Sequence, residues 1–236
     1  MSVTAFVPAR SGSKRLAHKN IRPLVGKPLL VWTLEACAGA SEVDTVILST
    51  DSDQYWEIAQ RHIPGAKLAL DRRDSEEAGD TVKIFDYLRD KRDKIFGGRT
   101  GAFVLALPTV PLRRASHVEE AIDLFRKEGR PVFSATTYGF PISFAFRLDA
   151  EGEWEPVFAD SPMVTGNTRS QNQAPSYHPN GAIYVRSIAD LAEPGLKSLY
   201  DGAKPYFMDA FSSVDIDNEI DFEVAAAIVQ SRRAQG

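Results

Sequence analysis

Short apolar runs alternate along this chain with longer segments in which apolar residues recur with the period of a helix. Strands that alternate with helices in this way are typical of a sheet whose strands run mostly parallel. The order of elements therefore predicts an α/β fold built on one mostly parallel sheet. Strands are predicted at residues 3–7, 45–49, 67–70, 103–107, 132–135, 182–185 and 205–210.

Helix start signals support the same fold class. Ser116 and Glu119 have the spacing of a capping box at the start of a helix over residues 117–127, in which Val118 begins an apolar face. Pro28 stands where proline is favoured, at the first position of another helix. Further helices are predicted at residues 54–61, 81–92 and 220–232.

The alternation breaks after residue 138. Residues 139–158 indicate two strands joined by an Asp-Ala-Glu-Gly turn, and their apolar side chains are too few to form a core of their own. Such a segment either folds back on the chain or pairs with another subunit, and we favour a dimerisation arm. The predicted organisation is an α/β domain of residues 1–138 and 176–236 with an inserted arm of residues 139–175.

The composition suits one large domain that recognises a small ligand. The chain has 236 residues, 43% of them hydrophobic, and a formal net charge of −4, so it lacks the basic charge of a dedicated nucleic-acid binder. The single cysteine, Cys37, excludes an intramolecular disulfide and is typical of a reducing compartment. No signal peptide is visible, and no apolar stretch approaches the ~20 residues that span a bilayer. We expect a cytoplasmic protein with neither a membrane nor a nucleic-acid partner.

The first predicted strand leads into a loop rich in cations. Residues 6–20 read FVPARSGSKRLAHKN, and residues 1–34 contain no acid although the chain has 32. Ligands of parallel α/β sheets bind at the carboxyl ends of strands, and the backbone around Gly12, between Ser11 and Ser13, can approach a phosphate closely. We expect a phosphate site; the alternative is a solvated basic loop. The sequence matches neither the P-loop nor the dinucleotide-binding motif. The loop's cations are Arg10, Lys14, Arg15 and Lys19.

A second candidate segment is SVDIDNEIDF at residues 213–222. In an extended segment Asp215 and Asp217 point to one face while Ile216 turns inward. Two carboxylates beside a polyphosphate suit Mg²⁺, which takes one or two carboxylates together with phosphates and waters. The alternative is that Asp217 caps the last helix and that nearby acids complement the helix dipole. The spacing alone leaves both interpretations open.

Two further segments could line a pocket. Residues 168–185 carry Arg169, two glutamines and Tyr177, which are planar hydrogen-bonding groups suited to a carboxylate or a sugar. Residues 105–117 lead from a strand end through a Pro-rich turn into a helix, although an ordinary βα loop explains that pattern equally.

Together these segments resemble the acylneuraminate cytidylyltransferase family, whose members join CMP to nine-carbon acidic sugars. The resemblance covers essentially the whole chain, because its motifs occur in the family's order. The opening motif is the specific one. The motifs are PARSGSKRLAHKN, IRPLVGKPLL, LSTDS, LPTVPLR and SVDIDNEIDF.

The resemblance implies a doubly wound, Rossmann-like nucleotidyltransferase fold, a homodimer held by the arm, and CTP, Mg²⁺ and a sugar acid as ligands. It implies that the anomeric hydroxyl of the sugar attacks the α-phosphate of CTP and expels pyrophosphate. The implied catalytic residues are Arg10, Lys14, Lys19, Asp215 and Asp217, of which the two aspartates hold the metal. The implied nucleotide-binding residues are Arg10, Ser11, Gly12, Ser13, Lys14, Lys19, Asn20 and Arg73. The implied substrate-binding residues are Leu107, Arg169, Gln171 and Tyr184.

Two departures from the family pattern leave the sugar open. Leu107 begins a Leu-Pro-Thr-Val-Pro segment where many members have Gln-Pro-Thr-Ser-Pro, so an apolar side chain replaces an amide. TRSQ with the following YH is similar to pseudaminate enzymes, whereas NGAIYV is similar to sialate and legionaminate enzymes. The alternatives are a cytidylyltransferase for another sugar acid, such as 3-deoxy-manno-octulosonate, and a nucleotide-binding relative without catalytic activity.

Overall fold

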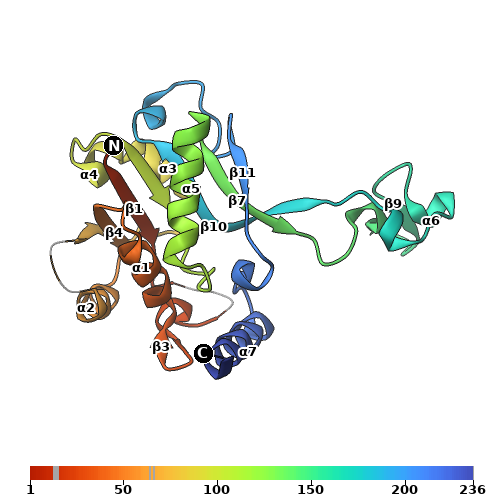
Figure 1. The fold of residues 1–236 in the computed structure, drawn as a ribbon, viewed down its shortest axis with the longest axis horizontal. Coiled ribbons are helices and arrows are strands. Elements are labelled where there is room, and N and C mark those ends of the chain that lie inside the picture. Colours follow the sequence, from red (N-terminus) through yellow and green to blue (C-terminus); the bar gives the residue numbers. More distant parts are fainter. Residues whose placement is uncertain (13–15, 64, 66, 236) are drawn as a thin grey trace. The chain divides into compact units, whose positions relative to one another are not determined.

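Seven strands form the main sheet of the computed structural model, which describes residues 1–12, 16–63, 65 and 67–235 (Figure 1). The strand order is β11-β7-β10-β6-β1-β4-β5. β1 pairs in parallel with β4 and β6, β4 with β5, and β11 with β7, whereas β10 runs antiparallel to β6. The mostly parallel sheet is therefore confirmed. The strands are β1 Val3–Pro8, β4 Thr45–Thr50, β5 Leu68–Arg72, β6 Ala102–Leu105, β7 Val132–Thr137, β10 Tyr177–Ser187 and β11 Lys204–Phe207.

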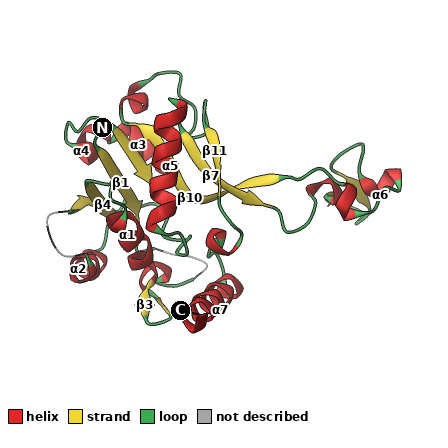
Figure 2. Ribbon diagram, in the orientation of Figure 1, coloured by secondary structure: helices red, strands yellow, loops and turns green. Residues whose placement is uncertain are grey.

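Helices cover both faces of this sheet, as Figure 2 shows for the helices in front of it. Side chains of β1 alternate between the faces: Val7 packs in an apolar layer with α1, α2 and α5, and Phe6 packs in another with α3 and α4. Two buried layers on opposite faces make the sheet doubly wound. The helices are α1 Leu29–Gly39, α2 Asp53–His62, α3 Ile84–Asp90, α4 Arg92–Phe96, α5 Ala115–Glu128, α6 Pro162–Thr165 and α7 Glu219–Gln235.

A third apolar cluster joins the two ends of the chain. Leu24 and Leu29 pack with Ile216 and Phe222, which brings α7 beside the hairpin of β2 (Pro23–Leu24) and β3 (Lys27–Pro28) (Figure 1). Ile216 is fully buried, so it anchors the segment that carries both predicted metal-binding aspartates. The inward orientation predicted for this isoleucine is confirmed.

Three helix predictions are wrong in detail. α5 begins at Ala115, and the backbone N–H of its capping residue Arg114 donates to Nδ1 of His117, 3.2 Å away. Ser116 therefore lies inside the helix, while Glu119, its predicted capping partner, accepts hydrogen bonds from the N–H and Oγ of Ser41. The predicted capping box fails because a distant serine recruits the glutamate.

The helix predicted over residues 81–92 begins later, at Ile84, and breaks at Lys91 into α3 and α4. The residues before it form turns instead. Asp74 and Glu77 exchange backbone-to-carboxylate hydrogen bonds, and the N–H of Val82 donates to the carbonyl of Gly79. These local bonds compete with the first helical turn. α1 likewise begins one residue later than predicted, with Pro28 at the capping position.

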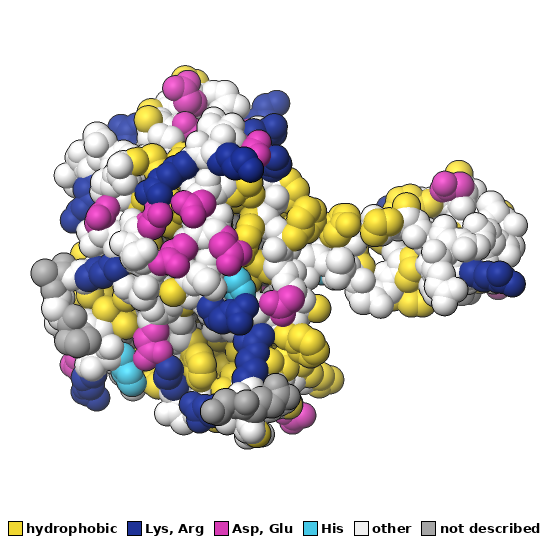
Figure 3. Space-filling model, in the orientation of Figure 1, with side chains coloured by type: hydrophobic (Ala, Val, Ile, Leu, Met, Phe, Trp, Pro, Cys, Tyr) yellow, Lys and Arg dark blue, Asp and Glu magenta, His cyan; other side chains and the backbone are white. Residues whose placement is uncertain are grey.

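The chain divides into two compact units, one of Met1–Ala135 with Asn180–Gly236 and the other of Thr136–Pro179. In the second unit β8 (Phe146–Leu148) pairs antiparallel with β9 (Trp154–Pro156), so the predicted hairpin is confirmed. Hydrophobic side chains lie on its surface (Figure 3). They include Phe140, Phe146, Leu148, Trp154 and Val164. Within the described parts of the chain, no helix is long and apolar enough to cross a membrane.

Candidate functional site

A cavity of about 500 Å³ lies in the first unit, where β1 and β6 end. Carboxyl ends of parallel strands are the usual ligand sites of such sheets. Its walls are partly charged and partly apolar. The polar lining residues are Arg10, Lys19, Asn20, Arg73, Asp80, Thr109 and Asp217, and the apolar ones are Pro8, Leu16, Val82, Ile84, Leu107 and Pro108.

The start of the basic loop is held from two sides. Asn20 Nδ2 donates to the carbonyl of Arg10 at 3.0 Å, and the carboxylate of Asp51 accepts from the backbone N–H of Ser11 at 2.8 Å and from its Oγ at 2.6 Å. Both polar groups that Ser11 could offer a phosphate are therefore engaged. A Cβ placed on Gly12 would meet nothing within 4 Å, so no described neighbour requires a glycine there. The predicted phosphate ligands Ser13 and Lys14 lie outside the described residues.

Arg10 and Arg73 line the same cavity in different states. Arg10 Nη1 forms an ion pair with Asp80, and both side chains are 35% exposed. Arg73 is only 5% exposed, donates from Nη2 to the carbonyl of Ser49 and faces the ring of Tyr87. Burial lowers the pKa of the Arg73 guanidinium, and nearby acids offset part of that effect. Of these two arginines, Arg10 is therefore partly solvated and Arg73 is desolvated.

Lys19 connects the basic loop to the acidic segment 197 residues later. Its Nζ donates to the carbonyl of Ile216 at 2.5 Å and lies 3.4 Å from Oδ1 of Asp217. The N–H of Ile216 donates in turn to the carbonyl of Thr109 at 2.8 Å. Lys19 and Asp217 therefore meet at one wall of the cavity, as the predicted site requires.

Asp215 retains exposed surface, but the protein around it disfavours its charge. Burial raises its pKa, a hydrogen bond from Thr109 opposes that shift, and the neighbouring charge of Asp217 raises the pKa further. Among the described residues, no group of three or more His, Cys, Asp and Glu side chains is arranged to hold a metal alone. Mg²⁺ bound beside phosphates needs only one or two carboxylates.

The last helix has a capping residue other than Asp217. Asn218 Oδ1 accepts from the N–H of Asp221, and Asp221 Oδ2 accepts from the N–H groups of Asp217 and Asn218. This exchange satisfies donors at the start of α7. Asp217 contributes only its backbone to it, which removes the capping explanation for its carboxylate.

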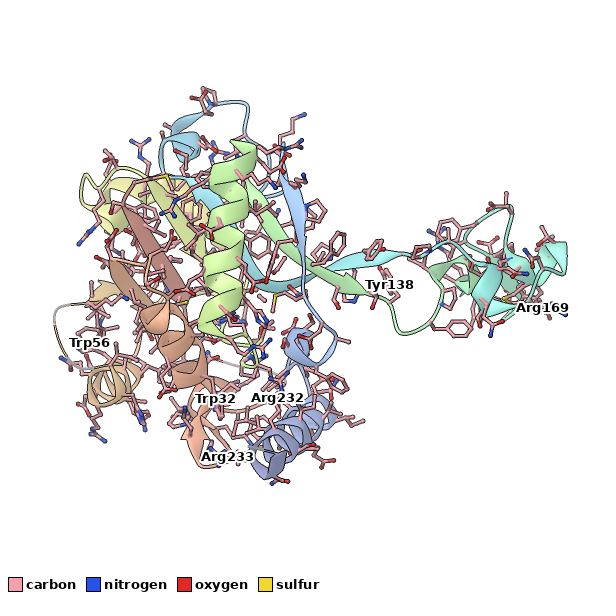
Figure 4. All side chains as sticks on the ribbon, viewed as in Figure 1. Trp32, Trp56, Tyr138, Arg169, Arg232 and Arg233 are labelled. Atoms are coloured by element: carbon pink, nitrogen blue, oxygen red, sulfur yellow. The ribbon has the colours of Figure 1, made fainter. Side chains whose placement is uncertain are left out.

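The four predicted sugar-side residues lie in different places. Leu107 lines the cavity, whereas Tyr184 lies on β10 in the apolar layer of α3 and α4, with its OH 3.0 Å from that of Tyr200. Burial and the Tyr200 contact raise the pKa of Tyr184. Arg169 and Gln171 belong to the second unit, where Figure 4 labels Arg169.

Two acids of the site escaped sequence reasoning. Asp51 follows the predicted second strand directly, in LSTDS, so its position at the carboxyl edge was a usable signal. Asp80 follows no strand, and nothing in its local sequence connects it to Arg10, 70 residues earlier.

Comparison with known proteins fits this geometry, since the profile of the Cytidylyltransferase family matches residues 4–185. The chain belongs to the cytidylyltransferase family. An N-acylneuraminate cytidylyltransferase of Escherichia coli O18:K1:H7 is 34% identical over 236 residues, which cover 99% of this chain and 53% of that relative. A CMP-N,N'-diacetyllegionaminic acid synthase of Legionella pneumophila is 29% identical over 240 residues, which cover 98% and 97%. This family member therefore spans about half of the first relative and nearly all of the second.

A solved structure supports the fold of this cytidylyltransferase-family chain. CMP:2-keto-3-deoxy-manno-octonic acid synthetase, complexed with CTP, superposes with a TM-score of 0.69 over 98% of this chain and 100% of that one. The two sequences are 17% identical. The similarity confirms the predicted nucleotidyltransferase-like sheet.

Proposed function

We propose that this protein transfers CMP from CTP to the anomeric hydroxyl of a nine-carbon 2-keto sugar acid and releases pyrophosphate. The main support is the cavity, which is lined by three cations and a carboxylate: Arg10, Lys19, Arg73 and Asp217. Cations that surround a triphosphate beside a carboxylate suit phosphoryl-type transfer, where catalysis consists mostly of positioning and charge neutralisation. The names of the E. coli and Legionella relatives support the choice of CTP and of a sugar acid.

In the proposed reaction the hydroxyl oxygen forms a bond to the α-phosphorus, and the bond from that phosphorus to the bridging oxygen of the β-phosphate breaks. The hydroxyl proton goes to solvent, and negative charge collects on the leaving pyrophosphate. Arg10 and Lys19 offset this charge, together with Lys14 as the sequence predicts. Lys19 is held in place by the carbonyl of Ile216, so its charge is oriented before CTP arrives.

Mg²⁺ is part of the proposal, with Asp215 and Asp217 as its protein ligands. The two carboxylates flank the buried Ile216, and the charge of Asp217 is one of the causes that raise the pKa of Asp215. A divalent cation would offset this repulsion, so the residues fit the ion. Bound Mg²⁺ would neutralise phosphate charge and orient the α-phosphate.

The sugar acid is proposed to contact Leu107, which lines the cavity. Roles for Arg169, Gln171 and Tyr184 in sugar binding remain predictions from the family resemblance. Names of both curated relatives refer to nine-carbon acids, which supports this class over an eight-carbon acid. Leu107 offers only van der Waals contact, which favours a deoxy or acyl group of the sugar over a hydroxyl at this point.

We also propose a homodimer held by the segment of residues 139–175. The support is the number of large apolar side chains on the surface of Thr136–Pro179, which suit a subunit interface better than solvent. Deletion of residues 139–175 should give monomers in sedimentation experiments. A dimer that survives this deletion would show that the segment does not hold the subunits together.

We also propose a cytoplasmic location for the protein.

Pyrophosphate release is the decisive assay for the activity. The purified protein is incubated with CTP and Mg²⁺ and a panel of N-acylneuraminate, legionaminate, pseudaminate and 3-deoxy-manno-octulosonate. We expect release with at least one nine-carbon acid and none when EDTA is present. CTP binding without turnover on any acid would instead support the non-catalytic alternative, and turnover on the eight-carbon acid alone would correct the substrate class.

A further inference from the structure

Arg113 is a buried cation that the proposed reaction leaves without a role. It lies in the turn between β6 and α5, and only 3% of its surface is exposed. Nη1 donates to Oγ1 of Thr33 at 2.7 Å and Nη2 donates to the carbonyl of Leu107. Nε has no hydrogen-bond partner. Within the described parts of the chain, the hydrogen-bond partners of the guanidinium are this hydroxyl and this carbonyl, and no carboxylate forms an ion pair with it.

Such a group is costly to keep. Moving an ion from water into a protein interior costs several kcal/mol in practice, and buried arginines are therefore normally paired with carboxylates. Burial lowers the pKa of Arg113 to about 10, while Cys37 and Asp215 act in the opposite direction. The side chain remains charged at neutral pH. A hydrophobic residue of similar size would fill this place at lower cost, so the guanidinium needs another explanation.

Arg113 contacts a residue that lines the cavity of the candidate site. Leu107 lies just after the end of β6 and lines the cavity, and its carbonyl accepts from Arg113 Nη2 and also from the N–H of Val110. The guanidinium thus closes the turn of residues 107–113 across its base. Thr109, inside this turn, also lines the cavity.

Thr109 then supports the acidic segment. Its carbonyl accepts from the N–H of Ile216 at 2.8 Å, and its side chain hydrogen-bonds to Asp215. The position of Asp215 and Asp217 relative to the cavity therefore depends on the shape of the turn that Arg113 closes. The buried positive charge also lies close enough to Asp215 for the two to interact electrostatically.

We propose that Arg113 is a positioning residue for this site: it fixes the 107–109 wall and, through Thr109, holds the two aspartates where the α-phosphate is transferred. This inference rests on the proposed function. It assigns no contact with substrate to Arg113. A shift of about 1 Å in catalytic groups lowers turnover by about a hundred-fold, so a positioning residue out of contact with substrate can affect kcat strongly.

Arg186 provides a matched control. It is a second buried guanidinium, 4% exposed, whose Nη2 likewise donates to backbone carbonyls, those of Leu199 and Asp201. It differs from Arg113 in that its Nη1 also pairs with the carboxylate of Asp190 at 3.0 Å. In the sheet it pairs with Phe103 near the start of β6, whereas the cavity lies beyond the other end of this strand. Lysine at either position keeps the charge and loses the two-pronged donor, so both variants should lose stability.

The test compares Arg113→Lys with Arg186→Lys by urea unfolding, calorimetric titration with CTP, and steady-state kinetics per folded molecule. We expect Arg113→Lys to lower kcat at least about ten-fold with KM for CTP within about two-fold of the parent, and Arg186→Lys to leave both constants unchanged. Equal kcat values for the two variants, or a kcat for Arg113→Lys equal to that of the parent, would overturn the inference.

A milder variant covers the case in which Arg113→Lys does not fold. Thr33→Val has nearly the same shape and removes one acceptor of the guanidinium. We expect it to lower kcat about two- to five-fold at unchanged KM, and unchanged kcat would count against the inference. Failure of the proposed function is distinguished from these outcomes because it appears in the parent protein, as binding of CTP without turnover on any acid of the panel.

Discussion

The ion pair between Arg10 and Asp80 should compete with the proposed binding of CTP. Both residues line the cavity, and Arg10 is the cation that we expect to contact the phosphates. A triphosphate can use Arg10 fully only after Asp80 releases it, and the carboxylate repels the incoming phosphates. Replacing Asp80 by asparagine should therefore strengthen CTP binding, which is the opposite of the usual effect of a substitution in a binding site.

The exposure of the pair sets the size of this effect. Exposed ion pairs contribute about 0.2–1 kcal/mol, and with each side chain 35% exposed we take the upper end of that range, about 1 kcal/mol. CTP binding no longer has to break the pair once Asp80 is replaced, so the binding free energy becomes more favourable by about the same amount. This corresponds to a KM or dissociation constant about five-fold lower. Salt screens both the pair and the repulsion, so the difference should shrink as ionic strength rises.

The assay is KM for CTP at a saturating sugar acid, with calorimetric titration of CTP as an independent measurement. Asp53→Asn is the matched control, because Asp53 also pairs with an arginine, Arg72, but is 80% exposed and lies outside the cavity. It should leave KM unchanged. If Asp80→Asn instead weakens CTP binding by more than about three-fold, Asp80 helps to bind the nucleotide, and the idea of competition is refuted.

Three further outcomes are expected. Asp217→Asn should lower kcat at least about a hundred-fold while the urea midpoint stays unchanged, because this exposed carboxylate is a proposed ligand of Mg²⁺. Asp51→Asn should raise KM for CTP about ten-fold, because the start of the basic loop loses a charged acceptor. Burial acts to raise the pKa of Glu77, but hydrogen bonds from Lys94 and Lys91 outweigh it and lower the pKa to about 2. This carboxylate is therefore stabilising above its ordinary pKa of 4.5, and its contribution to the unfolding free energy is lost as pH falls from 4.5 towards 2, which acid titration of Glu77→Gln beside the parent checks.

Periodicity allowed the fold to be predicted because it is a local signal. The runs at residues 3–7 and 45–49 became β1 and β4 almost unchanged. The hairpin of β2 and β3 was missed, since its turn places Val25 at φ 50 and Gly26 at φ 83, and a β-branched residue at positive φ gives no turn signal. The capping error at α5 has the same origin, because the structure used a distant serine that no local pattern contains.

The sequence predicted which charged segments form the candidate site, but it did not predict which side chains pair with one another there. The basic loop and the acidic segment stand out by charge and spacing, and the cavity brings Lys19 together with Asp217. The carboxylate that holds Ser11 and the one that engages Arg10 come from elsewhere in the chain, 40 and 70 residues away. Partners at such separations are decided by packing, which sequence periodicity does not report.

The acidic segment is held in the site by apolar burial more than by charge. The ion pair of Arg22 with Glu219 also connects the two ends of the chain, through two contacts of 2.6 Å, but both side chains are more than a third exposed, so solvent and salt screen the pair. Full burial of a side chain such as Ile216 contributes about 1.5–3 kcal/mol, and Phe222 adds a further amount of this kind. High salt should therefore weaken the proposed contact of CTP with Arg10, which is 35% exposed, well before it releases Asp217 from the cavity. We therefore expect salt to change the affinity for CTP more than the integrity of the site, because Arg10 is partly exposed whereas Ile216 is fully buried.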